Sequence, residues 1–144
     1  MAGVRRVTRS ILRYVYPLYV LAVILQVYFA GEGIFGAREA DQTIEDANTL
    51  NLHRDFGWII TEPIALLLLI VTLLAWLPNV RLRIISIVTP FVLWIQLILP
   101  SGGRWVAAFH PVNALLILGL LGYLTWAFWT GRATAEEHPA AAAA

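Results

Sequence analysis

The sequence predicts an all-α membrane protein, a four-transmembrane-helix up-and-down bundle, on two observations. First, 60% of its 144 residues are hydrophobic and 13% are charged, whereas soluble domains carry about 25% charged residues. Second, the apolar residues form four runs of the length that a bilayer requires, about 20 residues each. Four spans nearly fill the chain, which argues against a water-soluble enzyme. The net charge of +1 lacks the basic excess of nucleic-acid-binding proteins, so no nucleic-acid partner is expected.

The four apolar runs define the expected helices of a single transmembrane domain over residues 1–133. These helices are expected at about residues 11–30, 56–77, 84–99 and 105–129. A polar outer loop is expected over residues 31–55, and the alanine-rich tail of residues 134–144 is expected to be disordered. Gly31, Gly33 and Gly36 follow the first run. Because glycine tolerates tight turns and close backbone contact, we expect a tight reversal of the chain and a close backbone approach there.

The distribution of arginine predicts the orientation, because cytoplasmic flanks of membrane helices accumulate positive charge. One side of the predicted bundle carries Arg5, Arg6, Arg9, Arg13, Arg81, Arg83 and Arg132. The other side carries Arg38, Arg54 and Arg104. The predicted location is therefore the cytoplasmic membrane of a bacterium, with the N- and C-termini inside.

Polar side chains within the predicted spans are few, and each is costly in a bilayer. They are Gln26, His53, Glu62, Gln96, His110 and Asn113. Gln26, Gln96 and His110 lie near the outer ends of three different helices, and His53 directly precedes the remaining one. These residues therefore predict a polar layer near the outer face of the membrane.

His53 lies just before the second predicted helix and His110 lies five residues into the fourth. These two helices run in the same direction through the predicted bundle. In such a bundle these helices lie on a diagonal of roughly 13 Å, which suits two imidazoles that face one metal. The pattern predicts non-covalent haem b, with both histidines as ligands of the iron. The sequence has no cysteine, which excludes covalent haem attachment and iron–sulfur ligation. Zinc, which needs four ligands in a closed site, and copper, which usually brings cysteine or methionine, are less favoured.

Several neighbouring residues belong to the same candidate site. Each histidine is followed four residues later, on the same helical face, by a small residue, Gly57 or Ala114. These small residues are expected to leave space for the porphyrin. Arg54 and Arg104 are expected to pair with the haem propionates. Either Asn113 or the two glutamines, Gln26 and Gln96, are expected to contact the imidazoles.

Structural roles compete for the same residues. His53 lies close to the interface, where a histidine is often solvated or caps a helix. His110 precedes Pro111, and its ring is able to bond a carbonyl that the proline frees. For Gln26 and Gln96, interhelical hydrogen bonds are favoured over a direct functional role.

Glu62 is the other costly residue, and it lies nine residues after His53. Nine helical steps of about 100° leave half a turn, so Glu62 is predicted to face away from the histidine site. Pro63 is expected to kink the second helix and to free a carbonyl that a protonated Glu62 is able to bond. A proton relay and a hydrogen bond to a quinone are the functional alternatives.

Two segments of the chain resemble one four-helix half of the haem A synthase family. They read Leu-His-Arg-Asp-Phe-Gly over residues 52–57 and Phe-His-Pro-Val-Asn-Ala over residues 109–114. The chain also resembles small uncharacterised four-span bacterial membrane proteins with His-Arg-x-x-Gly and His-Pro-x-Asn-Ala segments. The resemblance implies that His53 and His110 are axial haem ligands. Only one half is present and Leu50 stands where the family has a glutamate, so the expectation is a haem-b-binding half-module instead of haem A synthesis.

The expected function is therefore electron transfer by a b-type cytochrome at the outer face of the membrane, alone or as a subunit of a respiratory or redox complex. The expected partners are the lipid bilayer and a quinone or redox partner subunit. An electron carrier or subunit is favoured over a complete enzyme, and no residue is assigned a catalytic role. The alternatives are a non-haem structural or accessory membrane subunit and a small transporter component.

Overall fold

The computed structural model describes residues 1–43 and 47–134, and it is helical throughout apart from short connections. The elements are α1 (Ala2–Glu39), η1 (Asn48–Leu50), α2 (Asn51–Thr61), α3 (Pro63–Ala75), α4 (Val80–Ile98), η2 (Leu99–Ser101), α5 (Gly103–Ala107) and α6 (Phe109–Trp129). No β-strand occurs in these two described ranges. The predicted all-α class is confirmed, whereas the tail predicted as disordered lies, apart from Thr134, outside the described residues.

Four helical stretches are long and apolar enough to cross a membrane. They are Ala2–Glu39, Asn48–Ala75, Val80–Ser101 and Gly103–Trp129. Large apolar side chains face outward on each of them, for example Leu18 at 64%, Leu67 at 59% and Leu115 at 71% exposure. Soluble proteins rarely expose apolar surface on this scale, because it is unfavourable in water. The chain is thus a multi-pass helical membrane bundle.

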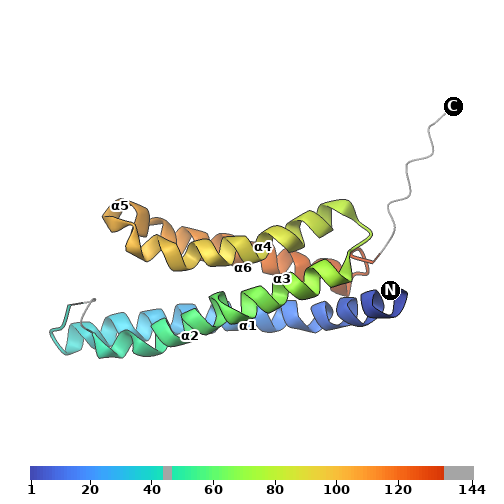
Figure 1. Cartoon of the computed structure of the whole chain (residues 1–144). Coiled ribbons are helices and arrows are strands. Elements are labelled where there is room, and N and C mark those ends of the chain that lie inside the picture. Colours follow the sequence, from blue (N-terminus) through green and yellow to red (C-terminus); the bar gives the residue numbers. More distant parts are fainter. Residues whose placement is uncertain (44–46, 135–144) are drawn as a thin grey trace.

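The four stretches form a ring in which each has two neighbours. The helix α1 packs against α6 and against the α2–α3 pair, and α4 packs against the same two partners. Within the described residues the backbones of α1 and α4 do not approach one another, nor do those of α6 and the α2–α3 pair. The second and fourth spans therefore lie on a diagonal, as the sequence predicts. Figure 1 shows the start of α1 and the end of α6 at one end of the bundle and α5 at the other.

The helices are longer than the apolar runs. The helix α1 has 38 residues and, at 1.5 Å per residue, a length of about 57 Å, which exceeds the bilayer core of about 30 Å. The predicted outer loop of residues 31–55 is wrong in its extent, because α1 continues to Glu39 and η1 already begins at Asn48. Hydropathy marks where a helix meets lipid, and it does not mark where backbone hydrogen bonding stops.

The glycines after the first apolar run lie inside α1, so the reversal predicted there is wrong. The predicted close approach is confirmed at Gly33 and Gly36, whereas no atom of another described segment lies within 4 Å of a Cβ atom built on Gly31. A Cβ atom on Gly33 would lie 2.9 Å from Leu50 Cγ, and one on Gly36 would lie 2.9 Å from Thr49 Cγ2. The Thr49 hydroxyl also donates to the Gly33 carbonyl at 2.8 Å. These glycines therefore let η1 pack directly on the end of α1.

The second span is broken in its middle, as Pro63 predicts. The break separates α2 from α3 at Glu62, whose backbone has φ −102° and ψ −81°. Pro63 is the first residue of α3, where its missing N–H is tolerated. The Ile60 carbonyl, in the turn before the break, accepts a hydrogen bond from the buried Tyr19 hydroxyl of α1. A neighbouring helix thus compensates part of the interrupted hydrogen bonding.

Candidate functional site

The polar residues predicted as a layer lie on four different helices of the bundle. Gln26 lies on α1, His53 on α2, Gln96 on α4 and His110 on α6, and all four residues are half-buried. They form two hydrogen-bonded pairs, one between α1 and α2 and one between α4 and α6. We call Gln26 with His53 the first pair, and Gln96 with His110 the second pair.

In the first pair, side chain and backbone bond reciprocally. The Gln26 side-chain amide donates to the His53 carbonyl oxygen at 2.7 Å. The His53 Nδ1 atom lies 3.1 Å from the Gln26 carbonyl oxygen. Because a carbonyl only accepts, Nδ1 carries a proton, and in the neutral imidazole Nε2 then keeps a lone pair. The His53 ring is thus held by α1 in the tautomer that binds a metal through Nε2.

The second pair repeats this arrangement. The Gln96 side-chain amide donates to the His110 carbonyl oxygen at 3.1 Å, and His110 Nδ1 lies 3.1 Å from the Gln96 carbonyl oxygen. The same amide nitrogen lies 3.1 Å from His110 Nε2. Nε2 therefore accepts an amide proton here, and that contact must be released before its lone pair can bind a metal.

Asn113 adds further hydrogen bonds to the second pair. Its side-chain amide donates to Gln96 Oε1 at 2.8 Å and to the Val92 carbonyl oxygen at 3.1 Å. The bond to Oε1 determines which end of the Gln96 amide faces His110. Of the two predicted alternatives, Gln96 is thus the residue whose side chain contacts the His110 ring, and Asn113 acts on His110 through Gln96.

In the first pair, the Gln26 side chain packs against Gly57 of α2. A Cβ atom at this position would collide with the Gln26 side-chain amide nitrogen. The absence of a side chain at Gly57 therefore lets Gln26 pack against α2. The sequence predicts a porphyrin in that space. Gln26 Oε1 is buried and has no hydrogen-bond partner among the described residues.

The two histidine rings meet across the diagonal of the bundle. Their centroids are 6.3 Å apart and their planes are inclined by 72°. A metal–nitrogen bond of about 2.0–2.1 Å and about 1.2 Å from ring nitrogen to ring centre place two imidazoles on opposite sides of one metal at about 6.4 Å between centroids. The observed separation of 6.3 Å is close to that value, while the Gln96 amide nitrogen lies against His110 Nε2.

The donor set distinguishes between metal centres. In the described ranges, no group of three or more histidine, cysteine, aspartate or glutamate side chains is placed to hold an ion. A closed tetrahedral zinc site needs four protein ligands, so the two imidazoles do not suffice for it. Haem iron takes four nitrogens from the porphyrin and needs at most two ligands from the protein, a number that two imidazoles supply.

The remaining predicted site residues belong to neither pair, and they are Arg54, Arg104 and Ala114. Arg54 donates to the Ala47 carbonyl oxygen at 3.3 Å and to Asn51 Oδ1 at 3.2 Å. Arg104 lies over the Trp105 ring, 5.6 Å from its centroid. Both guanidinium groups are thus held by the helix ends around them. Ala114 is half-buried on α6, one turn after His110.

Glu62 takes no part in the two pairs. Its side chain is exposed at the break between α2 and α3. Its own N–H and carbonyl continue the helical hydrogen bonding, to the Trp58 carbonyl at 2.9 Å and from the Leu66 N–H at 3.1 Å. The break therefore does not depend on the carboxyl group.

The reciprocal bonding of each glutamine to a histidine backbone is the feature that sequence reasoning missed. A signal for it exists, because glutamine precedes histidine in the same order in both halves of the chain. The two spacings differ, 27 residues in the first pair and 14 in the second, since the first connection contains the end of α1 and η1. This difference hides the repeat from any search at a fixed period.

Comparison of the chain with protein-family models, with curated proteins and with solved structures found no match. The resemblance to a half of haem A synthase therefore stays a prediction. Fold and site define the class, a four-helix membrane bundle with a paired glutamine–histidine layer.

Proposed function

We propose that this protein binds one haem b non-covalently between His53 and His110 and transfers electrons at the outer face of the membrane. The supporting observation is the separation of 6.3 Å between the two ring centroids, together with the Nδ1 contact that leaves Nε2 of His53 available. On His110, Nε2 becomes available once the Gln96 amide releases it. When bound, haem supplies a one-electron redox couple. The histidines would hold the iron, and Gln26 and Gln96 would orient the two rings.

The absorption spectrum of the purified protein tests this proposal. After expression with adequate haem, we expect a Soret band and a shift of the visible bands on reduction. The His53→Ala, His110→Ala double variant is expected to lose them, because it removes both residues that would hold the iron. His138→Ala is the matched control, since His138 is the remaining histidine of the chain and lies outside both pairs. Absence of a Soret band in the wild type, or its full retention in the double variant, would refute haem binding.

A structural role is the second candidate, favoured by a different observation. Both His Nδ1 atoms and both glutamine amide nitrogens already have protein partners. Such a layer stabilises helix packing without a cofactor. If the wild type is colourless and the histidine variants lose thermal stability, the layer is a structural element of an accessory membrane subunit.

The proposed topology is up-and-down, with both termini on the cytoplasmic side of a bacterial inner membrane. It rests on the arginines gathered where α1 begins and α6 ends. Because the chain has no cysteine, single-cysteine variants report orientation cleanly. A membrane-impermeant thiol reagent should label Ser101→Cys in intact cells from which the outer membrane has been removed, and should label Thr130→Cys only after lysis. The reverse pattern would invert the orientation.

The electron partner follows from the position proposed for the haem. A single haem near one face does not by itself carry electrons through the bilayer, so the partner has to reach that face. A membrane quinol or a redox partner subunit meets this requirement. Oxidation of the reduced protein by a quinone analogue, measured at the visible absorption bands, distinguishes the two.

A further inference from the structure

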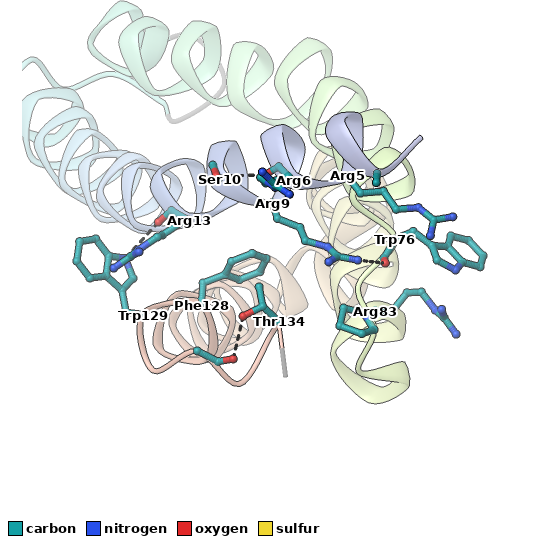
Figure 2. Close-up of a pocket in the computed structure, with 13 residues that line it drawn as sticks. Arg5, Arg6, Arg9, Ser10, Arg13, Trp76, Arg83, Phe128, Trp129 and Thr134 are labelled. Carbon is teal, nitrogen blue, oxygen red and sulfur yellow. Dashed lines mark hydrogen bonds between the residues drawn. The ribbon is translucent and has the colours of Figure 1, made fainter. Parts of the chain in front are cut away.

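A cavity of about 860 Å³ lies at the end of the bundle opposite α5, and it is strongly basic. Five arginines line it: Arg5, Arg6, Arg9, Arg13 and Arg83. Four of them come from the start of α1 and the fifth from α4, as Figure 2 shows. No acidic side chain of the described residues lines this cavity. Its positive charge is therefore not neutralised by that part of the protein.

Three of these arginines are held in place by neighbouring groups. Arg9 donates from Nε to the Ala75 carbonyl at 3.0 Å and from a terminal nitrogen to the Trp76 carbonyl at 2.8 Å. These bonds satisfy carbonyls at the end of α3. Arg13 and Arg83 each lie 4.5 Å from the centroid of a tryptophan ring. The guanidinium groups are thus oriented before any ligand arrives, which lowers the entropic cost of binding.

Arg5 and Arg6 differ from these three. Both side chains are exposed and form no hydrogen bond or ion pair that involves the other described residues. A guanidinium has five N–H donors in a planar fork, which suits the oxygens of a phosphate. The cavity therefore combines fixed positive groups with two free ones.

We propose that this cavity binds the phosphate of an anionic phospholipid headgroup. Phosphate is the chemistry that a cluster of arginines without a carboxylate recognises. Basic pockets between transmembrane helices on the cytoplasmic side are a recurring headgroup site. The proposal is independent of haem, because the cavity shares no residue with the two glutamine–histidine pairs.

The surroundings favour a lipid over a soluble phosphate. Trp76 and Trp129 line the cavity, and tryptophan is enriched where the headgroups lie. Along α1 the cavity is followed by outward-facing Ile11 and Leu18, which are 41% and 64% exposed. Acyl chains of a lipid held by its phosphate would lie against this apolar surface.

Native mass spectrometry of the detergent-solubilised full chain tests the site. Phosphatidylglycerol and phosphatidylcholine with the same acyl chains are titrated separately, and bound lipid is counted. We expect phosphatidylglycerol to bind about tenfold more tightly, because each arginine near an anionic headgroup adds attraction. The Arg5→Gln, Arg6→Gln variant should lose most of this preference while keeping its helical circular dichroism spectrum.

The control variant is Arg38→Gln, Arg81→Gln, which removes the same charge from exposed positions outside the cavity. It is expected to keep the preference for phosphatidylglycerol. An equal loss in both variants would show a general charge effect and overturn the proposal, as would equal binding of the two lipids. Displacement of phosphatidylglycerol by equimolar inorganic phosphate would reassign the cavity to a soluble anion. If the double variant does not fold, each single variant should give a partial loss, and no loss in either refutes the site.

Discussion

The two glutamine–histidine pairs share the same reciprocal bonds and differ in how they are completed. In the second pair, Asn113 satisfies Gln96 Oε1. In the first pair, the equivalent oxygen of Gln26 is buried without a partner, and Gly57 instead lets the amide approach α2. One pair thus relies on a hydrogen-bond network and the other on close backbone packing. The difference shows that similar ring placement can be reached by two physically distinct routes, which mutations should separate.

Substitution of Gly57 by valine is expected to have the largest effect. A side chain here collides with the Gln26 amide, so the first pair must separate or the helices must shift. We expect a loss of about 3 kcal/mol in stability, from overpacking and from broken interhelical bonds. Thermal unfolding in detergent measures it. Ala114→Val at the equivalent position of the second pair should cost less than half as much, and equal losses would contradict the distinction.

Substitution of the two glutamines is expected to give the next largest difference in stability between the pairs. Gln96→Met removes bonds to His110 and Asn113 and should cost about 2 kcal/mol, because buried groups are left unpaired. Gln26→Met removes the bond to the His53 carbonyl together with an unpaired oxygen. The expected loss of stability is about 0.5 kcal/mol, because removal of the unpaired oxygen is favourable and offsets part of the cost of the broken hydrogen bond. Thermal unfolding of both variants, side by side, checks the ranking. A larger effect of Gln26→Met would reverse it.

Asn113→Leu should weaken the second pair alone. It leaves Gln96 Oε1 and the Val92 carbonyl without their donor, with an expected loss of about 1 kcal/mol. A double-mutant cycle with Gln96→Met checks the mechanism. If Asn113 acts through Gln96, Asn113→Leu lowers stability less in the Gln96→Met protein than in the wild type. Strict additivity of the two losses would refute this coupling.

Glu62→Gln is expected to change stability least, by under about 0.5 kcal/mol. Its side chain is exposed and the helix break depends on Pro63. The Soret band should also stay unchanged, because Glu62 lies outside both pairs. Loss of proton-coupled uptake in liposomes containing this variant would instead support the transporter alternative.

Much of the site was accessible from residue chemistry. His53, His110, Gln26, Gln96 and Asn113 are all brought into one layer by hydrogen bonds or ring contact. Polar residues are so rare in these spans that each one points to a partner. The roles of Gly57 and Asn113 were not accessible, because they depend on which atoms of a glutamine face a neighbouring helix.

Composition and hydropathy by themselves determined that the chain is a helical bundle with four apolar spans, since lipid permits few other ways to satisfy the backbone. Proline at residue 63 likewise predicted the break in the second span, because it lacks an N–H. Only the tertiary structure decided that α1 runs on to Glu39, that each glutamine bonds a histidine backbone, and that five arginines share one cavity. These features arise from contacts between segments far apart in the chain, and such contacts leave no periodic trace in the sequence.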